Sequence, residues 1–419
     1  MRTSDNTGLK NYTQQFGLDT EPVPIEPCIS QEYFELEREH VFRRLWLHVG
    51  REEEIPELGD YFVKEIAMCN ASVLVVRGKD GVIRAFHNVC SHRGNQLAWT
   101  TQGSCRAFTC KFHGWTYNAE GRLTGVPDED QFFNLRREEH GLTPIATDTW
   151  EGFIFINLDP HPQETLQESL GELYAGLRGY PFKLVSGACY AWKAEVKCNW
   201  KVVKDAFQEA FHVPFVHKHS VADIASDSAN PLVHNNAFKF YGPHHMLSIY
   251  GSPVYKPNPI QALANQFGRG MTRYARDMQR ETWVPSWAEY TDRLPAEVNP
   301  TKTLNWIQDV FVLFPNLNVH IHDTLFYLTW QYWPLAVDRT LFEARWYMPK
   351  PRNAGQRFAQ EVTKCMAVDI VSEDLSTLEH TQVGLATRAK THFLLSDQEL
   401  CVRHSYKVLE DIVGPYRRA

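Results

Sequence analysis

Residues 90–115 read CSHRGNQLAWTTQGSCRAFTCKFHGW and contain two similar cysteine–histidine pairs. The stretch opens with the pair Cys90-x-His92 and nearly ends with the pair Cys110-x-x-His113, and seventeen residues lie between the two pairs. Each pair falls in a short loop that follows a predicted strand. Two such loops, facing each other, would present two thiolates and two imidazoles to one bound group.

The mixed composition of each pair favours a Rieske [2Fe–2S] cluster. In such a cluster two thiolates bind one iron and two neutral imidazoles bind the other, which removes negative charge and raises the reduction potential. The alternative is a tetrahedral zinc site, which also takes two cysteines and two histidines. Zinc motifs usually pair cysteine with cysteine and histidine with histidine, whereas each pair here is mixed. The predicted cluster ligands are Cys90, His92, Cys110 and His113.

The residues beside these ligands separate two kinds of Rieske protein. Respiratory Rieske proteins carry a further cysteine in each loop and join the loops by a disulfide. Asn95 and Phe112 stand at those places, and Cys105 alone cannot form the bridge. Gly94 and Gly114 suit tight loops in which backbone N–H groups approach the cluster. The stretch therefore predicts an oxygenase-type cluster and not a respiratory electron carrier.

Length, composition and charge narrow the class further. The 419 residues, 43% apolar and 22% charged, are enough for two compact domains. The net charge is −7 without a long run of Lys or Arg, which argues against nucleic acid and membrane partners. Nine scattered cysteines, an odd number, argue against a disulfide framework. Because neither a membrane-spanning run nor a secretory leader is visible, we expect a cytoplasmic protein that acts on a small molecule.

The order of local patterns predicts an α+β fold. Ser30 can cap a helix that runs up to Trp46. Short strands then alternate with glycine-containing turns at 78–81 and 118–121, which is typical of antiparallel β structure. Later residues mix helices with aromatic-rich strands, so we expect an antiparallel catalytic sheet covered by helices. The expected parts are an N-terminal helical segment packing on the catalytic domain (1–50), a small antiparallel Rieske domain (51–160) and the catalytic domain (161–419).

A second metal site is predicted in the segment DAFQEAFHVPFVH. On a helix, Asp205, Glu209 and His212 fall at i, i+4 and i+7 and so share one face. His217 follows His212 by five residues, and such a pair diverges by about 140° on a helix. The two imidazoles meet at one metal only if the helix breaks between them, and Pro214 is expected to supply the break.

The third ligand of this site is expected to be a carboxylate. Ferrous iron that binds O2 beside a substrate favours two histidines and one carboxylate on a single face. The best candidate in SEDLSTLEHTQVGLA is Asp374, on a predicted helix whose Leu375 and Leu378 are placed to pack against the sheet. Glu373 is adjacent, and spacing does not exclude it. The predicted ligands are His212, His217 and Asp374.

From about residue 30 onward the chain resembles the α subunits of Rieske non-haem iron oxygenases, the ring-hydroxylating oxygenase family. The resemblance rests on CSHRG, CKFHGW, NWK, EAFHVPFVH and EDLSTLEHTQVGL, in that order. It implies that Cys90 and Cys110 hold one cluster iron, that His92 and His113 hold the other, and that His212, His217 and Asp374 hold a mononuclear Fe(II).

The resemblance also implies roles for two further acidic residues. Glu209 matches the family's bridging acid, which hydrogen-bonds a cluster histidine of the next subunit, so a head-to-tail homotrimer is expected, with or without a β subunit. Glu209 and Asp205 are therefore expected to serve catalysis. Many members have Asn after the acidic residue that opens the helix, whereas Ala206 follows Asp205 here, so any contact of that Asn is absent or replaced. A bridging Glu occurs in ring hydroxylases and in demethylating members, which leaves the reaction subtype open.

The implied activity is that of a terminal mono- or dioxygenase. It would use O2 and electrons from NAD(P)H, delivered by a separate reductase with or without a ferredoxin, to hydroxylate an aromatic or other hydrophobic small molecule, as in aromatic hydrocarbon catabolism. The alternatives are oxidative N- or O-demethylation, an electron-transfer protein without a second iron, and a zinc-stabilised binding module. Specificity is expected in loops such as 220–300. Aromatic residues that could wall an apolar pocket, although core packing explains each, are Phe207, Phe211, Phe215, Phe314, Phe326, Trp330 and Tyr347.

Overall fold

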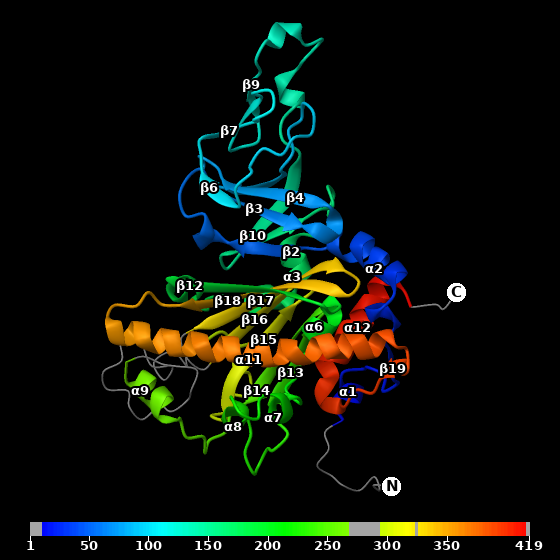
Figure 1. The fold of residues 1–419 in the computed structure, drawn as a ribbon, viewed down its shortest axis with the longest axis vertical. Helices are drawn as coiled ribbons and strands as arrows, with labels where there is room; N and C mark the ends of the chain where they lie inside the picture. The colour runs from blue at the N-terminus through cyan, green and yellow to red at the C-terminus, as the bar shows by residue number, and fades with distance from the viewer. Residues whose placement is uncertain (1–10, 268–293, 323–325, 416–419) are drawn as a thin grey trace. The chain divides into compact units, whose positions relative to one another are not determined.

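The structure, a computed structural model, describes residues 11–267, 294–322 and 326–415 (Figure 1). Part of the 220–300 segment, in which we expected specificity loops, lies outside the described residues. The described residues belong to two compact units: residues up to Phe34 together with Ala175–Ala419 form the larger, and Glu35–Tyr174 form the smaller. No helix in the described ranges combines the length and the apolar character needed to cross a bilayer.

The smaller unit is built from two antiparallel sheets. Its seven-stranded sheet has the order β2-β11-β10-β5-β4-β3-β6, and a three-stranded sheet has the order β7-β8-β9. The strands are β2 (Leu47–Arg51), β3 (Asp60–Ile66), β4 (Ala71–Arg77), β5 (Ile83–His87), β6 (Gln102–Ser104), β7 (Ala107–Thr109), β8 (Thr116–Asn118), β9 (Leu123–Gly125), β10 (Pro144–Trp150) and β11 (Phe153–Asn157). Two short helices, α3 (Leu166–Leu170) and α4 (Glu172–Gly176), follow the last strand.

Both predicted hairpin turns are present in this unit. The turn at 78–81 joins β4 to β5 and is closed by a hydrogen bond from the Gly78 N–H to the Val82 carbonyl, 2.9 Å long. The turn at 118–121 joins β8 to β9 and is closed by the Asn118 N–H and the Arg122 carbonyl. Gly81 and Gly121 adopt positive φ angles of 80° and 83°, which glycine reaches without steric cost.

The larger unit is organised around a seven-stranded antiparallel sheet of order β12-β18-β17-β16-β15-β14-β13. Strands β14 (HHMLSIY) and β16 (LNVHIH) are buried along their whole length, although each contains histidines and one further polar residue. Edge strand β12 alternates between less and more exposed residues. The strands are β12 (Ala188–Val196), β13 (Ala237–Tyr241), β14 (His244–Tyr250), β15 (Trp306–Leu313), β16 (Leu317–His322), β17 (Tyr327–Ala336) and β18 (Arg339–Met348).

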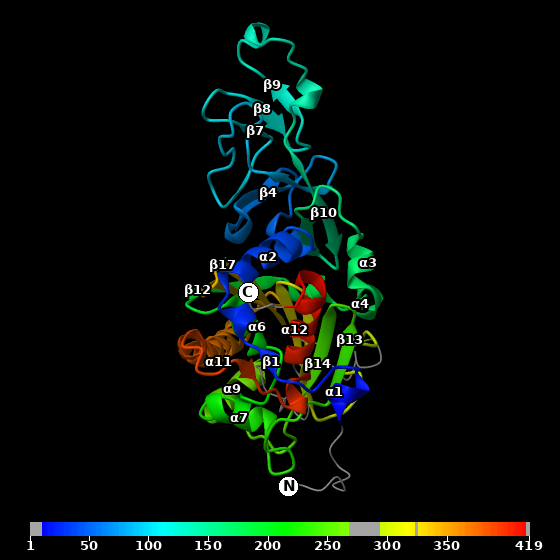
Figure 2. The same cartoon turned by 90° about the vertical axis from the view of Figure 1, so that its right-hand side faces the viewer.

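Helices of the larger unit pack against this sheet. Helices α6, α11 and α12 contact β17, β12 and β14 respectively (Figure 2). The helices are α1 (Tyr12–Gln15), α5 (Phe182–Val185), α6 (Trp200–Asp205), α7 (Val213–Val216), α8 (Ala222–Ala225), α9 (Pro259–Phe267), α11 (Ala354–Ala386) and α12 (Leu400–Val413). A two-stranded sheet pairs β1 (Val23–Pro24) with β19 (His392–Phe393). The predicted α+β class, with a small antiparallel β domain and an antiparallel catalytic sheet covered by helices, is confirmed.

Helix α11 is the longest described element, with 33 residues. Its buried residues recur every three or four positions, as expected for a helix with one face on the core. Ala367, Val371 and Leu378 belong to this stripe, and Asp374 occupies the same stripe with only 3% of its surface exposed. The sequence of α11 therefore places one carboxylate on an otherwise largely apolar face.

The N-terminal helix is shorter than expected. Ser30 does cap it, since its Oγ accepts a hydrogen bond of 3.1 Å from the Tyr33 N–H. The helix α2 (Gln31–Glu37) passes into a π-helical turn that ends at Phe42, so the expected extension to Trp46 is wrong. The π-helical segment, Arg38–Phe42, uses i→i+5 hydrogen bonds and so departs from the 3.6-residue repeat on which the expected extension depended.

Candidate metal centre and cluster site

The chain between α6 and α7 does not follow the expected continuous helix. Helix α6 ends at Asp205, so Asp205, Glu209 and His212 do not share one helical face. Pro214 is not the break either, because it lies in the first turn of α7, where its missing N–H costs nothing. His212 is the N-cap of α7 and His217 is its C-cap. The two histidines therefore flank a single turn of helix.

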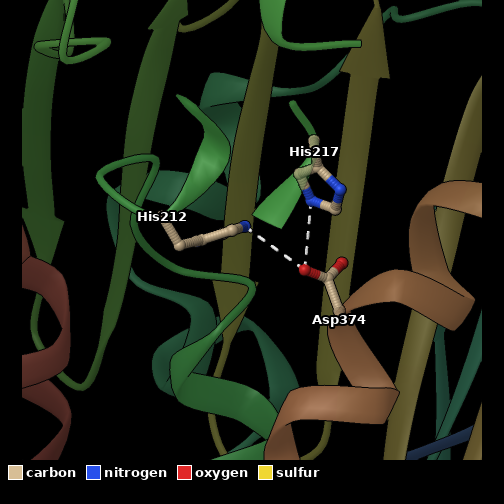
Figure 3. A group of neighbouring side chains, drawn as sticks. All are labelled: His212, His217 and Asp374. Atoms are coloured by element: carbon tan, nitrogen blue, oxygen red, sulfur yellow. Dashed lines mark ion pairs between the residues drawn. The ribbon is translucent and has the colours of Figure 1, made fainter. Parts of the chain in front are cut away.

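His212, His217 and Asp374 come together in the larger unit (Figure 3). The Nε2 atom of His212 lies 3.3 Å from Asp374 Oδ1, and the Nε2 atom of His217 lies 3.1 Å from the same oxygen. Within the described parts of the chain, this is the one group of three or more His, Cys, Asp or Glu side chains close enough to share a metal ion.

These separations fit a divalent transition metal. Bonds of about 2.1 Å that meet at right angles place two ligand atoms about 3.0 Å apart. The Nε2–Oδ1 distances of 3.3 and 3.1 Å are close to that value. Two imidazoles and one carboxylate on one side also leave the remaining coordination positions open, as in the facial triad of non-haem Fe(II) oxygenases.

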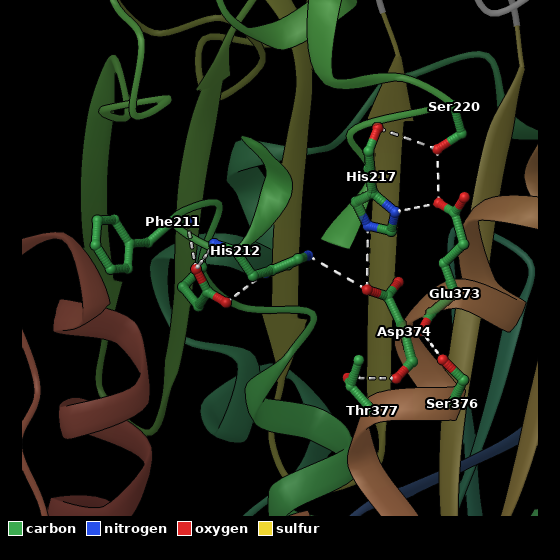
Figure 4. Close-up of polar contacts among 9 residues, drawn as sticks. Phe211, His212, His217, Ser220, Glu373, Asp374, Ser376 and Thr377 are labelled. Atoms are coloured by element: carbon green, nitrogen blue, oxygen red, sulfur yellow. Dashed lines mark hydrogen bonds and ion pairs between the residues drawn. The ribbon is translucent and has the colours of Figure 1, made fainter. Parts of the chain in front are cut away.

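A second carboxylate stands behind each histidine, and Figure 4 shows the one behind His217, Glu373. The Nδ1 of His212 contacts Glu209 Oε1, and the Nδ1–H of His217 donates a 2.7 Å hydrogen bond to Glu373 Oε2. Ser220 Oγ donates to the same Glu373 oxygen at 2.6 Å. Carboxylates in this position fix the tautomer, so each Nε2 presents its lone pair toward the metal position. Glu373 is therefore a partner of His217, and Asp374 is the carboxylate at the centre.

The charge balance of the group calls for a cation. Burial opposes protonation of His212, but Glu209 and Asp374 together raise the pKa of His212 to about 10. Burial would raise the pKa of Asp374, yet its contacts with His212 and His217 bring that pKa below its ordinary value. The carboxylates of Glu209, Glu373 and Asp374 surround only two imidazoles, those of His212 and His217. This excess of negative charge favours a bound divalent cation.

Asp205 does not join this group. Its Oδ1 accepts a hydrogen bond from Gln208 Nε2 and its Oδ2 accepts one from Tyr406 OH, both 2.8 Å long. Burial, opposed in part by Lys204, raises the pKa of Asp205 to about 7. Gln208 Oε1 in turn lies 3.0 Å from His245 Nε2. Asp205 is thus anchored in a buried polar network at the end of α6.

The two loops of the opening stretch have the same backbone design, in the smaller unit. The Cys90 carbonyl accepts from the Gly94 N–H at 3.0 Å, and the Cys110 carbonyl accepts from the Gly114 N–H at 2.9 Å. The N–H of each cysteine donates to the carbonyl five residues later, at 2.8 Å in both loops. Both glycines have positive φ angles, 76° and 74°. Two matched loops therefore present their cysteines in the same way.

The side chains of these loops suit a cluster. Cys90 and Cys110 are each 2% exposed and belong to the core of the smaller unit. Burial would raise the pKa of Cys110, but the N–H groups of Phe112 and His113 lower it below its ordinary value, which favours the thiolate that binds iron. The rings of His92 and His113 lie 4.7 Å apart, and His92 stacks on Trp115. The four side chains thus offer the sulfur and nitrogen donors of a mixed cluster.

A cavity of about 110 Å³ lies beside the metal centre. Its walls come from the sheet, from the α7–α8 region and from α11, and most of them are apolar. Of the aromatic residues considered as pocket walls, Phe207 and Trp330 line this cavity, and their rings are 4.2 Å apart. The other five candidates do not line it; Phe215, for example, is 63% exposed.

Two histidines on the cavity wall were not predicted from the sequence. His320 and His322 lie on β16 and are each 2% exposed. The alternation in NVHIH was the available signal, because residues two apart on a strand face the same side. Glu373 was considered as a possible metal ligand, but it instead accepts a hydrogen bond from His217 Nδ1. This contact depends on the orientation of α11, which the spacing of residues in the sequence does not show.

Two known families match the chain. Residues 187–414 match the family described as "Ring hydroxylating alpha subunit (catalytic domain)", which covers more than half of the chain. Residues 45–145 match the family described as "Rieske [2Fe-2S] domain". Domains of these two kinds bind a mononuclear iron and a [2Fe–2S] cluster.

Characterised relatives agree with the family matches. The chain is 29% identical over 220 residues to the carnitine monooxygenase oxygenase subunit of Escherichia coli K12. This alignment covers 52% of this chain and 58% of that protein. The chain is 36% identical over 191 residues to the biphenyl 2,3-dioxygenase subunit alpha of Rhodococcus jostii RHA1. This second alignment covers 44% of this chain and 40% of that protein. The matches thus span about half the length of these relatives.

The fold is also that of a solved relative. The crystal structure of naphthalene 1,2-dioxygenase from Rhodococcus sp. superimposes with a TM-score of 0.74 and 20% sequence identity, and the match covers 94% of each chain. At this identity the likeness establishes the architecture.

Proposed function

Because this chain belongs to the ring hydroxylating alpha subunit family and carries a Rieske [2Fe–2S] domain, we propose that it is the terminal oxygenase of a multicomponent Rieske oxygenase. The proposed reaction is the hydroxylation of an aromatic or other hydrophobic small molecule with O2. The observation that carries this proposal is the convergence of His212, His217 and Asp374 beside a mostly apolar cavity.

The proposed ligands follow from the two sites. Nε2 of His212, Nε2 of His217 and the carboxylate of Asp374 would hold the mononuclear Fe(II), and the cysteines and histidines of the matched loops would hold the cluster. When bound, the iron supplies O2 activation and the cluster supplies single electrons. The family matches at 45–145 and 187–414 support a Rieske domain and a catalytic domain in the expected order, and the proposed bounds of 51–160 and 161–419 differ from those of the smaller compact unit, Glu35–Tyr174. Of the segment expected at 1–50, the described residues up to Phe34 belong to the larger unit, whereas Leu47–Arg51 forms strand β2 of the smaller unit's sheet, so only the first part is proposed to belong with the catalytic domain.

The remaining residues prepare the site for this chemistry. Glu209 and Glu373 hold the Nδ1 protons of the two histidines, so that both Nε2 lone pairs point toward one position. The apolar cavity wall keeps bulk water away from that position and binds the hydrophobic body of the substrate. Asp205, with its raised pKa, holds Gln208 and Tyr406 in place at the end of α6.

Electrons have to come from outside the chain. We propose that NAD(P)H is oxidised by a separate reductase, with or without a ferredoxin, and that the cluster passes its electrons on singly. We further propose a head-to-tail homotrimer in which Glu209 connects the metal centre to a cluster histidine of the neighbouring subunit, with or without a β subunit. A role in aromatic hydrocarbon catabolism, in the cytoplasm, completes the proposal.

Oxidative demethylation is the second candidate reaction. It is favoured by the similarity to the carnitine monooxygenase oxygenase subunit. Such a reaction would oxidise an N- or O-methyl group and release formaldehyde, whereas ring or side-chain hydroxylation gives a stable diol, phenol or alcohol. The proposed metal centre serves both reactions, so the products distinguish them.

The test is product analysis with a surrogate reductase and 18O2. A panel of aromatic compounds and quaternary amines is offered to the purified protein, and 18O in a hydroxylated product supports the lead proposal. Formaldehyde from a methylated substrate supports the second candidate. A His217→Ala variant, expected to lower product formation at least about 100-fold, shows that any product comes from this site. Undiminished product formation in that variant would overturn the assignment of the site.

A further inference from the structure

The two loops of the cluster site exchange hydrogen-bond donors at their sulfur atoms. In the loop that follows β5, the side-chain amide of Asn95 donates from Nδ2 to Cys110 Sγ in the second loop, at 3.7 Å. On β8, just after the second loop, the hydroxyl of Tyr117 lies 3.3 Å from Cys90 Sγ in the first loop. Each cysteine is therefore contacted by a polar side chain from the other half of the motif.

The surroundings of Asn95 and Tyr117 show which atoms donate. The Nδ2 atom of Asn95 also lies 2.8 Å from the carbonyl oxygen of Gln96, which can only accept, so the amide nitrogen faces its acceptors. The hydroxyl oxygen of Tyr117 accepts the Ser91 N–H at 3.0 Å, which leaves the hydroxyl proton for Cys90 Sγ. A thiolate that binds iron has no proton, so it can only accept. Both side chains are therefore donors toward sulfur.

Both donors are held in fixed positions. The backbone carbonyl of Asn95 accepts the Cys90 N–H at 2.8 Å, so the amide projects from a loop that is itself anchored. Tyr117 is 0% exposed and is the middle residue of β8. A cation–π contact also joins the two loops, since the Arg93 guanidinium lies 5.3 Å from the centroid of the Phe112 ring. The donors thus reach the sulfurs from ordered parts of the smaller unit.

A hydrogen bond to a ligand sulfur affects the reduction potential of an iron–sulfur cluster. Reduction adds one negative charge to the cluster. A nearby donor stabilises the more negative state more strongly, because a hydrogen bond strengthens with the charge on its acceptor. A donor at Cys90 Sγ or Cys110 Sγ therefore makes the cluster easier to reduce.

We propose that Asn95 and Tyr117 are positioning residues that raise the reduction potential of the cluster by donating to Cys110 and Cys90. This inference rests on the proposed function, because it requires the cluster, and deepens it by naming residues that control how readily electrons enter. Asn95 stands at one of the two places where respiratory Rieske proteins carry a disulfide cysteine. A hydrogen bond thus joins the two loops where that class of protein uses a covalent bond.

The test measures the midpoint potential of the cluster in the full-length holoprotein. Potentiometric titrations followed by EPR of the reduced cluster compare the wild type with Asn95→Leu, which removes the amide, and with Tyr117→Phe, which removes only the hydroxyl. Each variant should shift the one-electron reduction equilibrium about 3- to 10-fold toward the oxidised form, the scale of one net hydrogen bond. For one electron this shift is a fall of about 30–60 mV in midpoint potential.

Further variants separate the hydrogen bonds from general effects on the smaller unit. Tyr61→Phe removes a hydroxyl that contacts Thr100 Oγ1 at 2.8 Å, and Gln102→Leu removes an exposed amide on β6. Both controls should keep the wild-type potential. Asn95→Ala removes the donor without introducing a bulky apolar side chain, so it should lower the potential even if leucine at this position hinders cluster loading.

The outcomes distinguish this inference from the proposed function. A wild-type potential in Asn95→Ala or in Tyr117→Phe would overturn the inference, and so would an equal fall in the two controls. In each of these cases the Rieske EPR signal is present and the proposed function stands. A wild-type protein that shows no Rieske EPR signal after reduction would overturn the proposed function, and the inference with it.

Discussion

Glu373 and Asp374 are neighbours in the sequence but lie on opposite sides of His217. Asp374 Oδ1 is 3.1 Å from Nε2 of His217, and Glu373 Oε2 is 2.7 Å from its Nδ1. Adjacent residues on a helix point about 100° apart, so one faces the centre while the other reaches around the ring. The sequence predicted both carboxylates as candidates but could not rank them by spacing, because their roles depend on how α11 docks.

A first prediction concerns this carboxylate behind the histidine. Glu373→Ala should weaken iron binding at the mononuclear site by about 10- to 100-fold, because the His217 Nδ1–H loses its acceptor. Iron affinity is measured by chelator competition. Glu379→Ala, in the same helix and away from the centre, is the matched control and should bind iron like the wild type. An equal loss in both variants would mean that the effect is on the helix and not on the histidine.

A second prediction concerns pH and a buried carboxyl away from the metal centre. Burial raises the pKa of Asp309 to about 7, although the Asn299 N–H and Trp306 Nε1 donate hydrogen bonds to it. Between pH 4 and 7 the folded protein therefore holds a proton that the unfolded chain releases, so the free energy of unfolding falls as pH rises through this window. The fall is at most about 4 kcal/mol, at roughly 1.4 kcal/mol per pKa unit.

Denaturant unfolding of the wild type and of Asp309→Asn at several pH values checks this. The variant should lose the part of the pH dependence that lies between pH 4 and 7, because its amide does not titrate. Identical slopes for the two proteins in that window would contradict the prediction.

The hairpin turns are the elements that the sequence predicted most directly. The turns GKDG (78–81) and NAEG (118–121) each end in a glycine at positive φ, Gly81 and Gly121. Because such a turn depends only on three or four adjacent residues, it can be predicted from the local sequence. The break after α6 was not predicted correctly, because Asp205 ends that helix through contacts with Gln208 and with Tyr406, two hundred residues away. Local chemistry is visible in a sequence, whereas contacts between distant segments are not.

A third prediction compares the two turn glycines. Gly81→Ala should cost about 1 kcal/mol, because alanine is strained at positive φ and its new methyl group meets no neighbouring atom. Gly121→Ala should cost about 2–4 kcal/mol, because its Cβ would also collide with the buried ring of Phe86. Chemical denaturation gives both values. Equal destabilisation by the two substitutions would show that Phe86 moves aside without cost.

At the scale of the whole molecule, each of the two compact units contains one candidate site. The paired motifs Cys90-x-His92 and Cys110-x-x-His113 lie in the smaller unit, and His212, His217 and Asp374 lie in the larger. Both sites could be proposed from residue types and spacing, because metal ligation restricts the side chains so strongly. The place of His320 and His322 on the cavity wall could not, because the sequence does not show which face of the sheet borders the cavity.

If this chain holds two separate iron sites, metal analysis combined with EPR should detect both in the same sample. The anaerobically purified protein should contain three irons and two acid-labile sulfides per chain, a Rieske EPR signal after reduction, and a second high-spin ferrous site that binds nitric oxide. His212→Ala should keep the cluster signal and lose only the nitric oxide signal and one iron. Zinc-loaded, colourless protein would rule out both iron sites, and a variant that keeps all three irons would rule out His212 as a ligand.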